Sequence, residues 1–307
     1  MIKYLKILLI IFLLMYSNGL TIENKIIFKI DNEIITTVDV LGEINNLKFF
    51  NKDINQLTDE EIYQIAVQSI TKYKIKKKSL SKNFGKIEFQ NDDYLNQIIQ
   101  KTYENLGFQD LKTFKNELSK NQISFKKFQE KLITDILWNQ VIFSKYYNKL
   151  IIDEEKLKKQ IKNNKEINSI YLKEIVYEVS DIKEIEEKYN LIIKDINVLG
   201  FESAAIKHSV SNTSSNGGDL GWINENSISN KILNELEKIS VKNVTEPIRI
   251  SSGFLILQKF DEREIQKDIN NEEELKKLID FEKNQQLNNY SNLYYNKIKK
   301  NFKINAP

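Results

Sequence analysis

Few side chains in this sequence are suited to acid–base or nucleophilic catalysis. Its 307 residues include one histidine, His208, and no cysteine. Without cysteine there is no thiolate nucleophile, no disulfide bond and no cysteine for lipid attachment. A transition-metal site would have to use mainly carboxylates, so we predict no metal and no other cofactor. His208 ends a predicted helix, where we expect a hydrogen-bonded or exposed imidazole rather than a catalytic one.

The sequence does not indicate phosphate chemistry or nucleic-acid binding. It has no glycine-rich loop that ends in Lys-Ser or Lys-Thr, so we expect no nucleotide-driven activity. Its 46 basic and 43 acidic residues give a net charge of +3, which is not typical of a nucleic-acid-binding protein. We expect the run Lys76-Lys77-Lys78 to lie on a solvated helix face rather than in a phosphate-binding patch.

Glycine is concentrated in one short segment. Three of the nine glycines fall between residues 217 and 221, in Asn216-Gly217-Gly218-Asp219-Leu220-Gly221-Trp222. Glycine reaches positive φ without a steric penalty and lets two backbones approach closely. Taken alone, the segment is typical of a tight turn.

The elements predicted around this turn occur in a recognisable order. An apolar strand at 170–179 is followed by a charged helix, a helix at 201–209 and the glycine turn. A helix at 228–237, the segment 244–249 and the apolar strand after Gly253 complete the series. These separated blocks resemble the parvulin-type peptidyl-prolyl isomerase family. The resemblance implies a small antiparallel sheet flanked by helices, which we place at residues 167–263.

An isomerase of this kind needs no nucleophile. Rotation about an X-Pro bond crosses a barrier of about 18–20 kcal/mol. A catalyst must hold the proline ring in an apolar pocket and stabilise the twisted amide. Active parvulins have a buried cluster of two histidines with a cysteine or aspartate, beside a pocket that is lined by Met or Leu and by Phe.

Most of these positions are replaced in the present sequence. The first histidine corresponds to Glu174, the second to Leu255, and the cysteine or aspartate to Ser211. The substrate-binding pocket residues correspond to Ile228 and Ile232. Because Leu255 cannot form a hydrogen bond, we predict that the isomerase site has degenerated. The alternative is an active isomerase.

The other family positions are mainly structural. Ser252 precedes the last glycine as it does in the family. We expect Gly217 and Gly218 to adopt positive φ, Gly221 to allow a close backbone approach before Trp222, and Gly253 to form the last hairpin turn. The structural motif thus comprises Gly217, Gly218, Asp219, Gly221 and Gly253.

The amino terminus predicts export. Lys3 and Lys6 precede an apolar run at 7–16, which is followed by Ser17-Asn18-Gly19. This arrangement is typical of a signal peptide, and we expect cleavage after Gly19 to release the protein into the periplasm. The apolar run is shorter than the roughly 20 residues of a membrane anchor, so we expect no stable membrane span after cleavage. Retention of the segment as an anchor is the alternative.

The segments that flank the parvulin-like unit also show a resemblance. A strand at 25–30, a turn at Asp31-Asn32 and a helix that begins near Thr36 and runs to Phe50 are followed by further helices. This opening resembles the SurA family of periplasmic chaperones. The resemblance implies an α+β fold with a helical amino-terminal domain at 20–165 and a carboxy-terminal segment, 264–307, whose helix packs on that domain.

Two classes of function remain open at this stage. The first is an ATP-independent chaperone that binds unfolded polypeptides, outer-membrane proteins in particular, and the second is an isomerase. A foldase tethered to the inner membrane is a third possibility. A chaperone needs an apolar groove or an exposed strand edge. Aromatic side chains that could line a groove, although each is more typical of a core, are Phe49, Phe50, Tyr63, Tyr94, Phe108 and Trp138.

Overall fold

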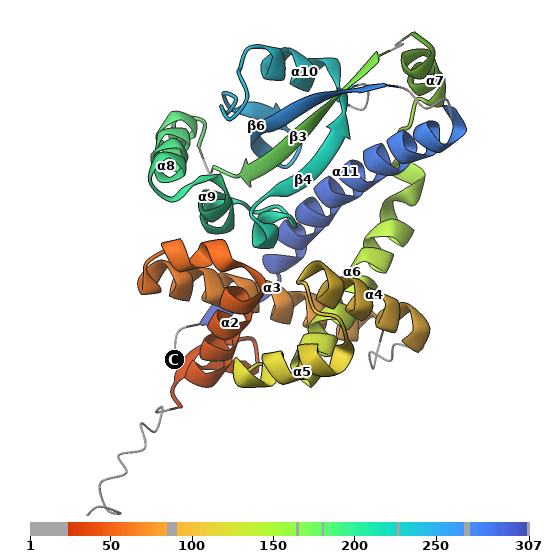
Figure 1. The fold of residues 1–307 in the computed structure, drawn as a ribbon. Helices are drawn as coiled ribbons and strands as arrows, with labels where there is room; N and C mark the ends of the chain where they lie inside the picture. The colour runs from red at the N-terminus through yellow and green to blue at the C-terminus, as the bar shows by residue number, and fades with distance from the viewer. Residues whose placement is uncertain are drawn as a thin grey trace, which may run out of the picture.

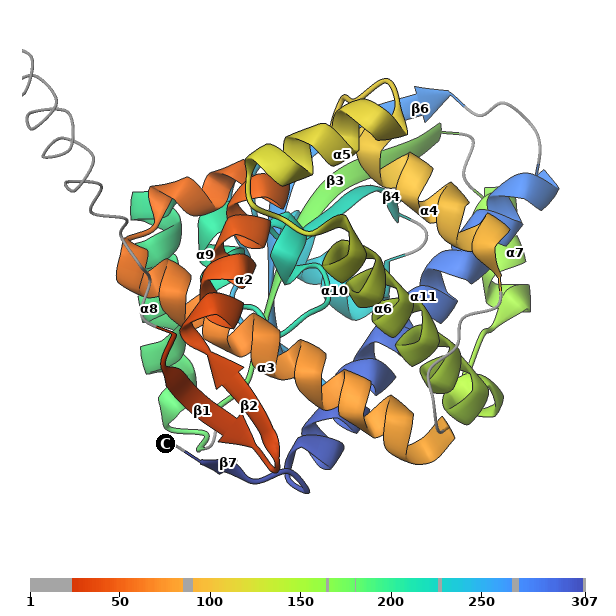
Figure 2. The same cartoon turned by 90° about the horizontal axis from the view of Figure 1, so that it is seen from below.

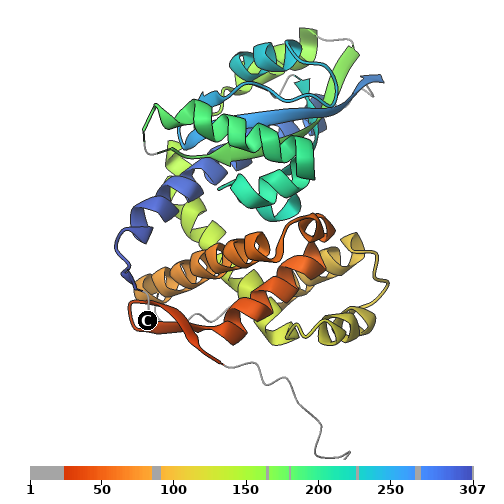
Figure 3. The ribbon, with the colours of Figure 1, turned by 90° about the vertical axis from the view of Figure 1, so that its left-hand side faces the viewer.

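A computed structural model describes residues 24–84, 91–163, 166–179, 181–225, 228–266 and 271–305. The predicted signal peptide lies outside this range. In the described part no helix has the length and apolar character needed to cross a membrane. Two lobes are joined by one long helix, α11 (Figures 1 and 3). We call residues 24–150 with 271–305 the helical domain, and residues 166–266 the sheet domain.

The helical domain begins with a hairpin and continues almost entirely as helix. The predicted strand, turn and first helix are confirmed, and a second strand, β2, lies between the turn and the helix. The elements are β1 (Ile26–Ile30), β2 (Glu33–Thr36), α2 (Thr37–Phe50), η1 (Lys52–Gln56), α3 (Asp59–Phe84), α4 (Asp92–Asn105), α5 (Leu111–Lys120), α6 (Phe125–Tyr146) and η2 (Tyr147–Lys149).

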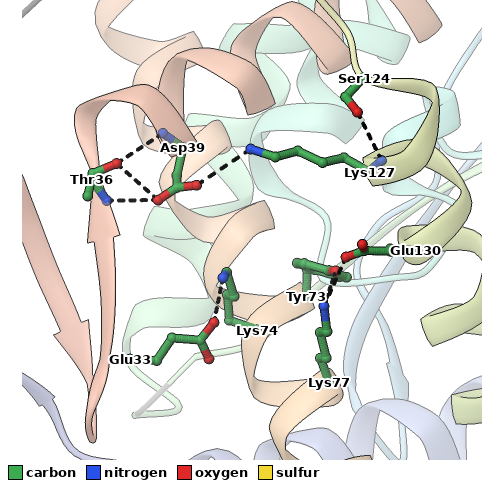
Figure 4. Close-up of polar contacts among 9 residues, drawn as sticks. All are labelled: Glu33, Thr36, Asp39, Tyr73, Lys74, Lys77, Ser124, Lys127 and Glu130. Atoms are coloured by element: carbon green, nitrogen blue, oxygen red, sulfur yellow. Dashed lines mark hydrogen bonds and ion pairs between the residues drawn. The ribbon is translucent and has the colours of Figure 1, made fainter. Parts of the chain in front are cut away.

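The first helix starts where its sequence provides a cap. The Thr36 hydroxyl accepts a hydrogen bond from the Asp39 backbone N–H, and the Asp39 carboxylate accepts one from the Thr36 N–H. This reciprocal pair satisfies two N–H groups that have no partner within the helix. Lys127 of α6 lies 3.9 Å from Asp39, and Lys74 of α3 pairs with Glu33 (Figure 4). The start of α2 is therefore linked to α6, and the hairpin strand before it is linked to α3.

The expectation that Lys76, Lys77 and Lys78 lie on a solvated face is wrong for Lys76. Lys76 is buried and its Nζ lies 2.8 Å from Asp135. Lys77 pairs with Glu130 of α6 at 3.1 Å (Figure 4). Lys78 pairs with Asp31 in the hairpin turn at 3.0 Å. Because α3 packs between the hairpin and α6, all three lysines face an acidic partner.

The sheet domain is built on a pair of long antiparallel strands. It follows α7 (Glu154–Asn163) and contains β3 (Glu166–Tyr177), α8 (Glu184–Leu199), α9 (Phe201–His208), η3 (Ser214–Asn216), β4 (Asp219–Asn224), α10 (Asn230–Glu237), β5 (Ile248–Ile250) and β6 (Gly253–Gln266). The antiparallel sheet has the order β4-β3-β6-β5. Side chains alternate between the two faces of a strand. Ile175 and Tyr177 pack against α8 and α9, whereas Leu172 and Val176 pack on the face covered by α10 (Figure 1).

The carboxy-terminal segment returns to the helical domain. Helix α11 (Asn271–Lys299) places Leu287, Tyr290, Tyr294 and Ile298 in the core formed by β1, α2, α3 and α6. The last strand, β7 (Ile304–Asn305), pairs antiparallel with β1 (Figure 2). The chain therefore has the predicted α+β fold, in which both ends of the sequence build one core and the sheet domain lies between them.

A second contact holds the two domains together through α9. The Ser203 hydroxyl donates to the Asp53 carbonyl of η1 at 3.0 Å, and the Asn51 side chain donates to the Ser215 carbonyl at 3.0 Å. Ile206 of α9 is buried in the core of the helical domain. Lys207 pairs with Glu61 of α3 at 2.5 Å. This interface combines apolar packing with polar contacts, so α9 is held firmly against η1 and α3.

Candidate functional site

A small pocket lies between the sheet, α10 and α11. Its volume is about 20 Å³, which is room for about one water molecule. The wall is mostly apolar, and among its described residues Glu174 is the one ionisable side chain. The lining residues are Leu172, Glu174, Leu220, Ile223, Ile228, Ser229, Ile232, Leu255, Leu257, Phe281 and Gln285.

Four of the predicted site residues meet in this pocket. Glu174 of β3 pairs with Leu257 of β6, and Val176, two residues later, pairs with Leu255. Glu174 and Leu255 therefore lie on the same face of neighbouring strands. Ile228 and Ile232 line the same pocket. Ile232 belongs to α10, and Ile228 immediately precedes the Ser229 cap of that helix.

The other two predicted site residues lie around this group rather than in the pocket wall. Ser211 donates its hydroxyl to the Glu174 carboxylate at 2.6 Å. Ser252 is buried in the turn between β5 and β6, and its hydroxyl donates to the Asn289 side chain of α11 at 3.3 Å. Ser211 thus supports the pocket carboxylate, whereas Ser252 contacts the carboxy-terminal helix.

The carboxylate of Glu174 is held by a pair of hydroxyl groups. The same oxygen that accepts from Ser211 accepts a hydrogen bond from Thr213 at 2.8 Å, and the two hydroxyl oxygens are 3.1 Å apart. Burial raises the pKa of Glu174, and the hydrogen bonds from Ser211 and Thr213 offset only part of that effect. Leu255 lies in the wall of the same pocket, at the position where the family resemblance places the second histidine. No imidazole from that position therefore joins Glu174 and Ser211.

The glycine turn contacts the backbone of Glu174. The Glu174 backbone N–H donates to the Gly218 carbonyl at 2.7 Å. A Cβ at Gly218, where φ is +76°, would lie 2.1 Å from the Glu174 carbonyl oxygen. Gly217 also has the predicted positive φ, at +63°. Gly218 is therefore the residue at which the turn and β3 approach most closely.

The structural role predicted for Gly221 is wrong. A Cβ at Gly221 would meet no atom within 4 Å, so this position requires no close approach. Its requirement for glycine comes from φ, which is +71°. Asp219 stabilises this conformation by accepting the Gly221 N–H at 2.9 Å, and it also accepts the Tyr171 hydroxyl at 2.9 Å.

Gly253 begins β6 after the predicted hairpin turn. Its φ is +135°, and a Cβ there would lie 2.3 Å from the Tyr177 carbonyl oxygen. This position therefore combines a backbone angle that favours glycine with a close approach to β3.

His208 has a structural partner, as predicted. Its Nε2 lies 2.6 Å from the Asp195 carboxylate of α8, and its side chain is 5% exposed. Asp195 also pairs with Lys207 at 2.8 Å, and Lys207 pairs with Glu61 across the domain interface. Lys188 lies 3.5 Å from Nδ1 of His208. Within the described residues no group of three or more acidic or histidine side chains is arranged to hold a metal ion.

We expect protonation of His208 to destabilise the protein as the pH falls from 7 towards 5. Burial lowers the pKa of His208 below 6.5, and the opposing effect of Asp195 does not restore it. The unfolded chain therefore takes up a proton at a higher pH than the folded protein, and this uptake favours unfolding. In urea titrations at several pH values, His208→Gln should remove this destabilising contribution. Glu174, whose pKa burial raises, should then make the variant more stable as the pH falls. The slope below pH 4.5, to which Glu61 and Asp195 contribute through their lowered pKa values, should remain. An unchanged slope between pH 7 and 5 in the variant would contradict this assignment.

Comparison with known proteins identifies the family of the sheet domain. Residues 155–261 match the family model of the PPIC-type PPIase, or rotamase, domain. This part of the chain is a parvulin-type domain. The match covers the whole four-stranded sheet apart from the end of β6 and includes Glu174, Leu255 and the glycine turn.

Relatives that match more of the chain than this domain are named as foldases and chaperones. The foldase protein PrsA 2 of Bacillus cereus is 24% identical over 205 residues, which covers 66% of this chain and 60% of the relative. The chaperone SurA of Idiomarina loihiensis is 22% identical over 258 residues, which covers 78% of this chain and 58% of the relative. A solved structure titled as SurA-like chaperones of Campylobacter jejuni has 17% identity and a TM-score of 0.36, with 92% of this chain and 99% of that chain covered.

The chain spans little more than half the length of the curated relatives it matches. The SurA similarity covers far more of the sequence than the parvulin domain alone, so it includes part of the helical domain. This extent agrees with a resemblance that goes beyond the parvulin domain.

Three residues at the site escape prediction from the sequence. Thr213 joins Ser211 on Glu174, and the pairing Ser-x-Thr beside the glycine turn could have indicated it. Phe281 and Gln285 enter the pocket from α11. Phe281 lies two residues after Ile279, which is a spacing that places two side chains on different faces of a helix. An aromatic residue away from the main apolar stripe was the available signal.

Proposed function

We propose that this chain is an ATP-independent periplasmic chaperone of the SurA type. Its clients would be unfolded exported polypeptides, outer-membrane proteins in particular. The observation that carries the proposal is the pocket of the parvulin domain. Leu255 forms part of its wall beside Glu174, and the space admits about one water molecule. Such a pocket argues against catalysis, and this favours the chaperone over the isomerase.

The size and the polar groups of this pocket support the proposed loss of isomerase activity. A proline ring needs far more room than one water molecule, so it cannot enter the pocket in this conformation. Glu174 is engaged by Ser211 and Thr213, and Leu255 supplies no hydrogen-bond donor or acceptor. Little remains that could stabilise the twisted amide differentially.

Chaperone activity is supported by strand edges and by exposed aromatic area. The sheet order leaves β4 and β5 at the edges of one sheet and β2 and β7 at the edges of the other. An extended client could add hydrogen bonds to such an edge. Of the six aromatic candidates from the sequence, Tyr94 is exposed, whereas Trp138 is fully buried. The other four are partly buried in apolar clusters, so we propose Tyr94 alone from that set for client contact.

Location and domain boundaries are part of the same proposal. We retain residues 1–19 as a cleaved signal peptide, which would deliver the mature protein to the periplasm. We also retain 20–165 as the chaperone domain, 167–263 as the parvulin domain and 264–307 as the returning segment. Sequencing the amino terminus of the mature protein tests the first statement, because a retained leader would favour a membrane-tethered foldase.

The family match favours one other function, an active peptidyl-prolyl isomerase. Two assays on the chain from Leu20 separate the alternatives. One follows cis/trans exchange in a proline peptide, with an isomerase of another fold as the positive control. The other follows aggregation of an unfolded outer-membrane barrel. We expect suppressed aggregation and no isomerisation above the buffer rate. A clear isomerase rate would contradict the proposal that the isomerase site has degenerated. Unaltered aggregation would contradict the proposed chaperone function.

A further inference from the structure

Helix α11 closes the pocket of the parvulin domain. Phe281 packs against the apolar cluster that contains Leu172, Ile228 and Leu255, and Gln285 lies one turn further along the helix. No other element outside the parvulin domain contributes to the lining described for this pocket. An aromatic side chain from the returning helix thus lies in the site where the family resemblance would place a substrate ring.

Phe281 is set apart from the other apolar contacts of α11. Before it, Leu278 packs against Leu157 of α7. After it, Leu287 and Tyr290 enter the core of the helical domain. Phe281 alone among these residues packs into the parvulin cluster, between two contacts that anchor the helix elsewhere. The contact of Phe281 with the parvulin cluster is therefore separate from the clusters that hold the rest of α11.

Two hydrogen bonds between the middle of α11 and the parvulin domain are long. Asn289 accepts a hydrogen bond from Ser252 at 3.3 Å, and Asn288 accepts one from the Asn212 side chain at 3.4 Å. Both distances exceed the usual ranges for hydroxyl and amide donors. These contacts orient α11 along the domain, and the apolar contact of Phe281 closes the pocket.

We propose that this pocket is a binding site for an apolar side chain and that Phe281 is its resident occupant. An apolar residue of a client binds there by displacing the Phe281 side chain from the pocket. The proposal rests on the proposed chaperone function and adds a second client site whose availability depends on this displacement. The apparent affinity for a client is then the affinity of the open pocket multiplied by the fraction of molecules in which the pocket is open.

A peptide-binding experiment tests this proposal on the full mature chain. The probe is the peptide Ala-Leu-Pro-Phe with an amino-terminal fluorophore, and binding is followed by fluorescence anisotropy. If the pocket is open in a tenth of the molecules or fewer, Phe281→Ala should bind the probe about tenfold more tightly or better. Leu293→Ala is the matched control, because it removes an exposed apolar side chain from the same helix. It should bind like the parent.

Two further variants keep the result interpretable. Phe281→Leu replaces Phe281→Ala in the experiment if the alanine variant folds poorly. It retains a smaller apolar side chain, so its affinity for the probe should lie between those expected for the parent and for Phe281→Ala. Ile232→Gln in the Phe281→Ala background should abolish the gain, because Ile232 lines the pocket. No gain in any folded Phe281 variant, or a gain that survives Ile232→Gln, would overturn the proposal. The parent's suppression of barrel aggregation is scored separately, so failure of the pocket site is distinguished from failure of the chaperone function.

Discussion

Replacement of Gly218 with alanine is expected to destabilise the parvulin domain by about 2–5 kcal/mol, from a steric clash together with a left-handed backbone. The added Cβ would lie 2.1 Å from the Glu174 carbonyl oxygen and 3.1 Å from its carbonyl carbon. Neither atom belongs to a flexible side chain. Glu174 is paired with Leu257 in the sheet, so β3 cannot move away without loss of ladder hydrogen bonds.

Gly221→Ala is the matched control for this clash. Its φ of +71° is close to the +76° of Gly218, but a Cβ there would meet nothing within 4 Å. Only the backbone penalty of about 1–2 kcal/mol applies. Urea unfolding followed by circular dichroism gives both free energies. Equal losses in the two variants would show that the loop relaxes and that the close approach to β3 is not the reason for Gly218.

Local features of the sequence were sufficient for much of this fold. The Thr36 cap, the helical periodicity and the glycine turn each involve residues that are near neighbours in the chain, so their geometry follows from backbone sterics and side-chain spacing. The roles of Gly221 and of Lys76 were misjudged for the opposite reason. Whether a glycine meets another strand, or a lysine meets Asp135, depends on elements that are far apart in sequence.

The site also contains residues that could be predicted from the sequence and one whose position depends on distant segments. Glu174, Leu255, Ile228 and Ile232 could be placed together because the order of strands and helices matches a known arrangement, and the structure brings them to one pocket. Phe281 could not be placed, since its position depends on the direction in which α11 crosses the sheet domain. That direction is fixed by anchors at both ends of the helix, namely Leu278 on α7 and Tyr294 in the distant core.

The second large effect is expected at the junction between the two ends of the chain. Trp138 of α6 is 0% exposed, and its indole N–H donates to the Ser291 hydroxyl of α11 at 2.8 Å. Its ring also lies 5.4 Å from that of Tyr294. Trp138→Ala should therefore cost about 3–5 kcal/mol, because it leaves a large cavity and removes the contact that holds α11. Urea unfolding measures this loss.

A double-mutant cycle separates the hydrogen bond from the packing. Ser291→Ala leaves the buried indole N–H of Trp138 without its acceptor, which costs about 1–3 kcal/mol. Trp138→Phe removes the donor and keeps most of the ring. In that background Ser291→Ala no longer strands a polar group, so we expect it to cost much less than it does alone. If the two losses simply add, the hydrogen bond contributes nothing measurable, and α11 is held on α6 by apolar packing alone.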